Sequence, residues 1–273
     1  MIAGFGAGYS GPSEIHYLFI DGGALLSRIH NLSAKYFNMQ AFEIDFSKMK
    51  GGYTKVFYYD ALPIREREEL EEVHKERIRE KTEFLDRVAA VDGVHVYEGD
   101  ARKRRRRGLE QKKVDVMLTV DLLTHTFRKN MHRATLLTGD NDFKPLVDTV
   151  VQDGMYITLW YPPDETSREL IHSADASKKL SMNYLKKLMT EESAVRFNLP
   201  DQQNHHGLRF PSLNPREIWG SNDRKKCMLY ENNGEFIATK EQDKVNTLHI
   251  THKNLDLLRY YCKESLDINV PET

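Results

Sequence analysis

The chain has 273 residues, of which 40% are hydrophobic and 30% are charged, and its formal net charge is −1. These values are typical of a soluble protein with a sizeable core. No apolar run reaches the roughly 18–20 residues of a membrane-spanning helix, and the amino terminus lacks the pattern of a secretory signal. We therefore expect a cytoplasmic protein with no membrane partner.

The first 13 residues are rich in glycine, and we predict that residues 1–13 form a flexible tail. Residues 6–11 match the Gly-x-Gly-x-x-Gly pattern of dinucleotide-binding loops. That pattern binds a cofactor only between a strand and a helix. Here no predicted strand precedes it and Pro12 follows it, so the tail interpretation is favoured.

Short apolar stretches then alternate with helical patterns. We predict strands over residues 15–20, 55–59, 94–97, 135–138 and 156–160, and helices over residues 24–36, 64–91, 114–127 and 142–152. Strands and helices that alternate at short spacing indicate right-handed β-α-β units. The sequence therefore predicts an α/β fold with a mostly parallel central sheet.

The character of the sequence changes after about residue 194. Residues 198–226 are rich in Asn, Gln, His, Pro and Arg, which predicts an irregular linker. An Asn-Gly pair at residues 233–234 predicts the turn of a hairpin, and residues 255–263 predict a terminal helix. We predict three parts: the tail over 1–13, a main domain over 14–194, and a small extension over 195–273 with linker, hairpin and helix.

The two cysteines, Cys227 and Cys262, lie far apart in this extension and neither belongs to a Cys-x-x-Cys pair. This spacing argues against a zinc site, and we expect reduced thiols packed inside the protein.

Aspartates follow candidate strand ends in four stretches. They are Asp21, Asp60, Asp115 and the pair Asp140 and Asp142. The carboxyl ends of parallel strands lie along one edge of a sheet, where ligands bind, so carboxylates from separate strands should converge there. Like charges that crowd together require a cation or protons to neutralise them. Carboxylates without thiolates suit Mg²⁺ or Mn²⁺, which indicates a metal-dependent site that acts on phosphate.

Each aspartate also has a structural explanation when it is taken alone. Asp21 and Asp140 could support turns, and Asp115 or Asp142 could cap a helix. Several strand-end carboxylates in one α/β chain favour the functional interpretation over these separate ones.

A basic run precedes Asp115. Residues 102–113 contain eight basic residues and one acidic residue, a local charge of +7. The run could be a solvated loop, but we favour an arm that holds the phosphates of a nucleic acid without reading its sequence. The candidate substrate-binding residues in it are Arg102, Arg104, Arg105, Arg106, Arg107, Lys112 and Lys113.

Three blocks, over residues 19–22, 111–121 and 138–147, resemble the NYN domain family, and within it the LabA-like branch, which is related to PIN-domain nucleases. The resemblance spans roughly residues 15–188. It departs from the family pattern after the first strand, where Gly23 and Ala24 replace the usual Glu or Asn. The family also tends to have glycine where Lys113 stands.

The resemblance implies a three-layer PIN-like fold and a ribonuclease that depends on Mg²⁺ or Mn²⁺. We expect an endoribonuclease, and exonuclease action stays open. The family's acidic metal-site residues match Asp21, Asp115, Asp140 and Asp142. Asp121 lies in the matching helix, but six residues separate it from Asp115, which is about 240° around a helix. It would therefore act behind the metal ligands or serve the fold.

Thr138 and Asn141 are candidates to hydrogen-bond a metal-bound water or the phosphate of the substrate. RNA is the expected partner, and DNA stays open as a substrate.

Three alternatives remain. A haloacid-dehalogenase-like phosphatase would use Asp21 as its nucleophile, but the second aspartate it typically requires is replaced by Gly23. A Toprim-like nuclease has an Asp-x-Asp pair similar to Asp140 and Asp142, but this chain lacks its early glutamate turn. The third is a catalytically inactive module that keeps the NYN fold and binds nucleic acid or protein.

Overall fold

The computed structural model describes residues 14–99, 109–206, 211, 213–243 and 245–271. The chain divides into two compact units. The first unit consists of Met1–Ser27 and Met49–Lys179, and the second consists of Arg28–Lys48 and Leu180–Thr273. Helix α1 (Gly22–Tyr36) therefore begins in the first unit and ends in the second. Helix α2 (Phe46–Lys50) begins in the second unit and ends in the first.

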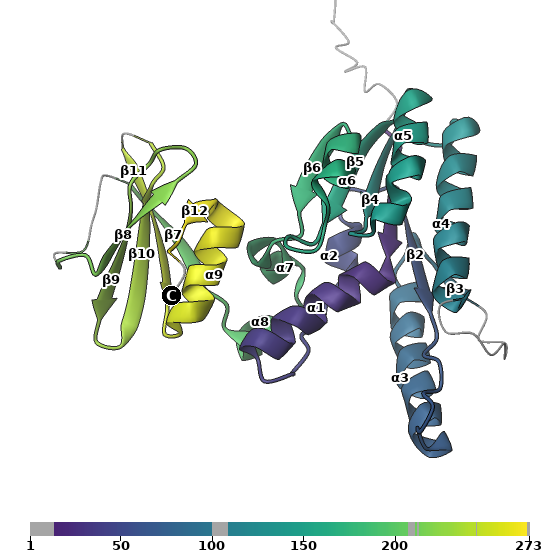
Figure 1. The fold of residues 1–273 in the computed structure, drawn as a ribbon, viewed down its shortest axis with the longest axis horizontal. Coiled ribbons are helices and arrows are strands. Elements are labelled where there is room, and N and C mark those ends of the chain that lie inside the picture. Colours follow the sequence, from purple (N-terminus) through teal and green to yellow (C-terminus); the bar gives the residue numbers. More distant parts are fainter. Residues whose placement is uncertain (1–13, 100–108, 207–210, 212, 244, 272–273) are drawn as a thin grey trace, which may run out of the picture. The chain divides into compact units, whose positions relative to one another are not determined.

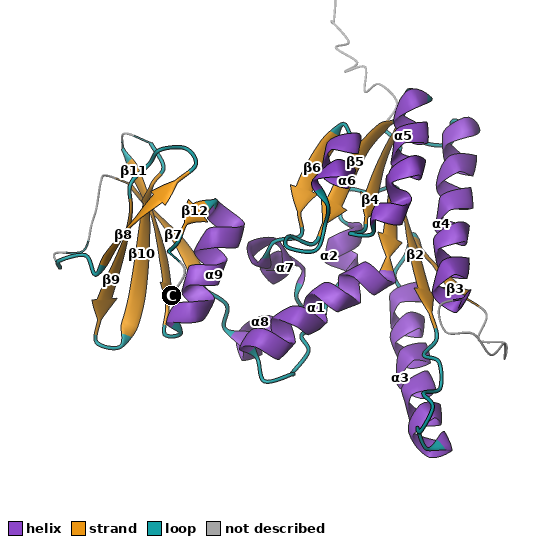
Figure 2. Ribbon diagram, viewed as in Figure 1, coloured by secondary structure: helices purple, strands orange, loops and turns teal. Residues whose placement is uncertain are grey.

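A fully parallel sheet forms the centre of the first unit (Figures 1 and 2). Its strands are β1 (His16–Asp21), β2 (Lys55–Ala61), β3 (Val94–Gly99), β4 (Arg133–Leu137), β5 (Tyr156–Tyr161) and β6 (Ala176–Lys179). Its helices are α3 (Glu71–Ala89), α4 (Leu109–Phe127), the 3-10 helix η1 (Asn141–Phe143), α5 (Lys144–Gln152) and α6 (Arg168–Ser173). The predicted α/β fold with a mostly parallel sheet is confirmed.

Helices cover both faces of this sheet because the side chains of a strand alternate between its faces. Phe19 and Phe57 point to one face and pack in a core with Leu118 of α4 and Val147 of α5. Tyr58 points to the opposite face, where its ring contacts Phe84 of α3. The first unit therefore has the three layers of a PIN-like fold.

The strand order of the sheet is β3-β2-β1-β4-β5-β6. From β1 the chain moves outward to β3, then returns to the other side of β1 for β4 and moves outward again to β6. Strands β1 and β4 are hydrogen-bonded neighbours at the point where the direction reverses. In open α/β sheets, ligands bind at the carboxyl edge of such a switch point.

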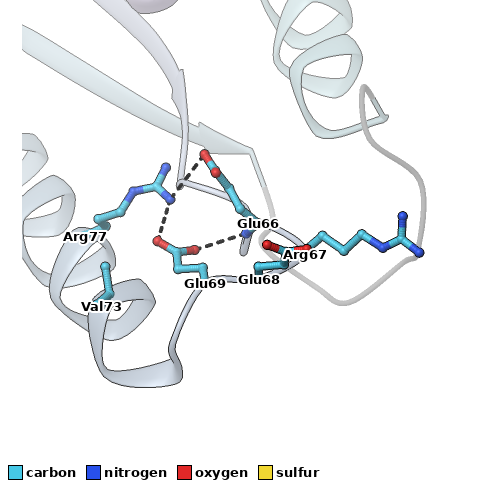
Figure 3. Close-up of a pocket in the computed structure, with 6 residues that line it drawn as sticks. All are labelled: Glu66, Arg67, Glu68, Glu69, Val73 and Arg77. Atoms are coloured by element: carbon cyan, nitrogen blue, oxygen red, sulfur yellow. Dashed lines mark hydrogen bonds and ion pairs between the residues drawn. The ribbon is translucent and has the colours of Figure 1, made fainter.

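Helix α3 begins at Glu71, later than the predicted start at residue 64. The preceding residues form a charged turn in which the backbone N–H of Glu66 donates to Glu69 at 3.0 Å. Arg77 pairs with Glu69 at 2.7 Å, while Arg67 extends away from this pair (Figure 3). The turn lines a hollow of about 780 Å³.

An antiparallel sheet and helix α9 (Leu255–Leu266) form most of the second unit. The strand order is β12-β8-β9-β10-β11-β7. The strands are β7 (Asp201–His206), β8 (Glu217–Ser221), β9 (Cys227–Asn232), β10 (Glu235–Glu241), β11 (Asn246–His252) and β12 (Ile268–Asn269), and the other helices are α7 (Met182–Leu188) and α8 (Glu191–Phe197).

Two features of this unit were expected and one was not. Strands β9 and β10 form the predicted hairpin, with positive φ angles at Asn233 and Gly234, and the terminal helix is present as α9. Residues 198–226 differ from the predicted irregular linker, because β7 and β8 lie within them.

Cys227 and Cys262 are both buried and free, as predicted. Of the helices in the described part of the chain, none is long and apolar enough to cross a membrane.

Candidate active site

Asp21 lies at the carboxyl end of β1 and is held there by two elements. One carboxylate oxygen, Oδ1, accepts a hydrogen bond from the backbone N–H of Ala24 in the first turn of α1, at 3.2 Å. The other, Oδ2, accepts one from the hydroxyl of Thr138, at 2.8 Å. Because Thr138 directly follows β4, this second bond joins the two central strands at the switch point.

The loop after β4 continues this chain of hydrogen bonds. The Thr138 hydroxyl also accepts from the backbone N–H of Asp140, at 3.2 Å. The Asp140 carboxylate in turn accepts from the backbone N–H of Asp142, at 2.9 Å, and so caps the short helix η1. Three of the predicted aspartates, Asp21, Asp140 and Asp142, therefore belong to one connected network, and Thr138 holds it together.

Asp115 comes from helix α4 and joins the group electrostatically. Burial raises the pKa of its carboxyl to about 6, and the negative charges of Asp21, Asp140 and Asp142 act in the same direction. Burial also raises the pKa of Asp21, and the charge of Asp140 adds to this effect, while the bond from Thr138 opposes it. The structure thus brings the four predicted aspartates into a single crowded field of negative charge.

Asp60 at the end of β2 adds a fifth carboxylate that was not predicted as a site residue. Its charge also raises the pKa of Asp21. Asp60 is buried, accepts a hydrogen bond from the Tyr58 hydroxyl at 2.9 Å, and pairs with Lys81 of α3 at 2.5 Å. Lys81 gave no signal in the sequence, because it lies in a helix with many charged residues and only its contact with Asp60 distinguishes it.

Gly22, which directly follows Asp21, packs against Asp60 and Tyr58. A Cβ at this position would lie 2.6 Å from Asp60 Oδ2 and 2.7 Å from the Tyr58 ring. The backbone that follows Asp21 therefore rests directly on Asp60 and Tyr58, and only glycine permits this close approach.

Other predicted residues lie in different surroundings. Asp121 accepts a hydrogen bond from the Tyr59 hydroxyl at 2.9 Å, and its charge is not among those that raise the pKa of Asp21 or Asp115. The Asn141 side chain accepts a hydrogen bond from Ser167, at 2.6 Å, which also caps α6. Lys113 is exposed on α4. The side chains of the remaining candidates, Arg102, Arg104, Arg105, Arg106, Arg107 and Lys112, lie outside the described residues.

A family model for the NYN domain matches residues 17–181, which is more than half of the chain and includes the four aspartates. The chain belongs to the NYN domain family. This confirms the resemblance to the NYN domain family that was found in the sequence. The NYN family is typically one of nucleases with a PIN-like fold, so this chain carries a nuclease-type domain.

One solved structure that is similar to this NYN protein is the crystal structure of a protein of unknown function from Vibrio parahaemolyticus. The two chains are 19% identical, the TM-score is 0.44, and the match covers 65% of this chain and 97% of the other. Among curated proteins, no match is found.

NYN and PIN-like nucleases generally use divalent metals. In the described part of the chain, no three acidic, histidine or cysteine side chains already form a group that could hold a metal ion. The chemistry of the donors is nevertheless suitable, because all four are carboxylates and their mutual repulsion would be relieved by a hard cation. The carboxylates would have to draw together as the ion binds.

The crowding predicts a pH-dependent stability in the absence of divalent ions. Because the pKa of Asp115 is raised from 3.8 to about 6, the folded state keeps this proton to a higher pH than the unfolded state does. Parent stability should therefore fall as the pH rises from about 4 through 6. An Asp115→Asn variant should not lose stability in this way, because asparagine does not ionise. Near neutral pH it should be more stable than the parent by about 1 kcal/mol, a small difference because Asp115 is partly exposed.

Urea unfolding in chelator at a series of pH values measures this difference. The extra stability of Asp115→Asn over the parent should shrink toward zero as the pH is lowered to the ordinary pKa of an aspartate, 3.8. A gain that is the same at every pH would show that charge repulsion is not its origin.

Proposed function

We propose that the protein is a metal-dependent ribonuclease, an endoribonuclease, that hydrolyses phosphodiester bonds of RNA at the carboxyl edge of the parallel sheet. The observation that carries this proposal is the network of Asp21, Thr138, Asp140 and Asp142 at the switch point, with Asp115 in the same field of charge. Membership of the NYN family supports it, because the family is typically one of nucleases.

Asp21, Asp115, Asp140 and Asp142 would hold Mg²⁺ or Mn²⁺. The ion, when bound, lowers the pKa of a water and stabilises the leaving oxygen of a phosphodiester. The protein's own residues would hold that ion in place, since the Thr138 hydroxyl holds the Asp21 carboxylate and the backbone of Asp140. Asp60 and Lys81 support the backbone of the β1–α1 turn through Gly22.

The proposal is tested by incubating the purified full chain with an unstructured RNA in Mg²⁺, in Mn²⁺ and in EDTA. We expect cleavage with either metal and none in EDTA. A circular RNA of the same sequence distinguishes endonuclease from exonuclease action, since only an endonuclease can open it, and a matching DNA tests the substrate class. An intact RNA in both metals, with normal folding of the protein, would refute the ribonuclease.

A second candidate is an NYN module that binds nucleic acid without cutting it. Gly23 and Ala24 support it, because they stand where NYN domains usually have a Glu or an Asn, and so does the lack of a preformed group of metal donors among the described residues. Binding of RNA without cleavage in any metal would establish this candidate.

The basic run supplies a further prediction about substrate affinity. Replacing Arg104–Arg107 with alanine should weaken binding across RNA sequences, because arginines that contact phosphates do not read bases. Each lost contact should flatten the slope of log affinity against log salt by roughly 0.7 for a single strand. Turnover at saturating RNA should change much less than affinity.

Fluorescence anisotropy at several salt concentrations measures the affinity and its slope. A variant with the affinity and slope of the parent would show that the run does not contact RNA and is a solvated loop.

A further inference from the structure

A second hollow lies within the second unit, between residues of α1 and α9. Its volume is about 550 Å³, which is within the range of sites that hold small molecules. It is lined by Lys35, Tyr36, Asn254, Asp256, Arg259, Tyr260, Lys263, Val270 and Pro271. All of these residues belong to one compact unit, so the hollow is a feature of that unit alone.

Two aromatic rings meet in this hollow. The rings of Tyr36 and Tyr260 have centroids 5.2 Å apart and are inclined at 39° to each other. Arg28 fixes the second ring by donating a hydrogen bond to the Tyr260 hydroxyl, at 2.8 Å. Both tyrosines are partly exposed and line the hollow.

Cationic side chains surround the rings. The Lys35 ammonium lies 5.3 Å from the centroid of the Tyr36 ring and 5.1 Å from that of Tyr260. Lys263 is exposed on α9, and no ion pair joins it to another described residue. Arg259 is held by Glu217, so Lys35 and Lys263 are the cations that remain to meet a ligand.

Of the described lining residues, Asp256 is acidic. One carboxylate does not balance the lysines and Arg259 in the lining, so the hollow keeps an excess of positive charge. The Asp256 carboxylate also offers an acceptor for an amino group. Val270 and Pro271 add an apolar wall.

The geometry points to a binding site for single-stranded RNA, in which a base packs on Tyr36 and Tyr260 and the adjoining phosphates contact Lys35 and Lys263. Stacking platforms combined with cations are the means by which proteins hold single strands without reading their sequence. An acidic peptide would explain the lysines but would leave two accessible tyrosine rings without a role. This site goes beyond the proposed function, because it uses none of the four aspartates and lies in the other unit.

The test measures binding of fluorescein-labelled poly(U) to the full chain in EDTA, so that cleavage cannot interfere. Tyr36→Ala should weaken binding by about tenfold, the usual loss for one stacked base. Tyr36→Phe keeps the ring and should bind as the parent does. Lys35→Gln combined with Lys263→Gln should weaken binding and flatten the salt slope by roughly 1.4, which is two phosphate contacts.

Lys253→Gln is the matched control, since Lys253 is an exposed lysine of the same unit that does not line the hollow. The double lysine variant alters only exposed side chains, so it remains informative if Tyr36→Ala fails to fold. Affinity and salt slope unchanged in the double lysine variant would overturn the site.

Two competitors identify the ligand. Competition by UMP at the same nucleotide concentration as poly(U) would assign a free nucleotide and overturn binding of a strand. Equal affinity for poly(Glu) would assign an acidic peptide and overturn binding of RNA. Because all these measurements are made without metal, failure of cleavage in the parent would leave their result unaffected.

Discussion

An Asp140→Asn variant should lose RNA cleavage while keeping the fold. The Asp140 carboxylate caps η1 by accepting from the Asp142 backbone, and an asparagine carbonyl accepts the same bond about as well. The substitution therefore removes one negative charge and little else. We expect turnover to fall by more than the ~100-fold that follows loss of a partner behind a metal ligand.

Turnover at saturating RNA measures the loss of cleavage, and the free energy of unfolding in urea measures whether the fold is kept. Without metal, stability should hold or rise slightly, because repulsion within the cluster is reduced. Asp148→Asn on α5 is a suitable control, since Asp148 is also a partly exposed aspartate, paired with Lys144 outside the cluster. Cleavage by Asp140→Asn at the rate of the control would remove Asp140 from the mechanism.

The largest loss of stability is expected from Arg28→Met in the second unit. Arg28 and Glu264 form an ion pair in which both side chains are 3% exposed. Arg28 also donates to the backbone carbonyl of Leu180, and Glu264 accepts from the backbone N–H of Met182 at 2.9 Å. Removing the arginine leaves a buried carboxylate without its cation, which costs about 3–5 kcal/mol.

The free energies of unfolding of Arg28→Met, Glu264→Gln and the double variant distinguish the interaction within the pair from the interactions of each residue with its surroundings. The double variant should be less destabilised than the sum of the single ones, because it no longer buries an unpaired charge. Lys144→Met, which breaks the exposed pair with Asp148, should cost less than about 1 kcal/mol. Equal losses in Arg28→Met and Lys144→Met would show that burial of the pair is unimportant.

The central strands could be predicted from sequence because burial on both faces makes them continuous apolar runs, as in residues 17–20 of β1. Two of the edge strands, β6 and β7, carry no such signal, unlike the edge strand β3 with its alternating valines. Strand β6 reads Ala-Ser-Lys-Lys, and β7 reads Asp-Gln-Gln-Asn-His-His, and each pairs with a strand on one side only. Both were missed for this reason, and the segment that contains β7 was interpreted as a linker.

Asp21, Asp140 and Asp142 could be singled out because a parallel sheet gathers its strand ends at one edge. Asp115 was expected past a strand end too, but it lies within helix α4. The sequence does not specify that β1 lies between β2 and β4, and this strand order is what places Asp60 near Asp21 and lets Thr138 join two strands. The helical angle between Asp115 and Asp121 predicted that the two side chains face different neighbours. In agreement, Asp121 accepts a hydrogen bond from Tyr59.

The composition of the second unit has a consequence for how the protein is made. Residues 28–48 emerge early from the ribosome, yet they belong with residues 180–273. The parallel sheet is complete once β6 has been synthesised, whereas Arg28 meets Glu264 only after α9 has left the exit tunnel. The later turns of α1 must wait, with Arg28 still in water and without its partner Glu264, until α9 has been translated.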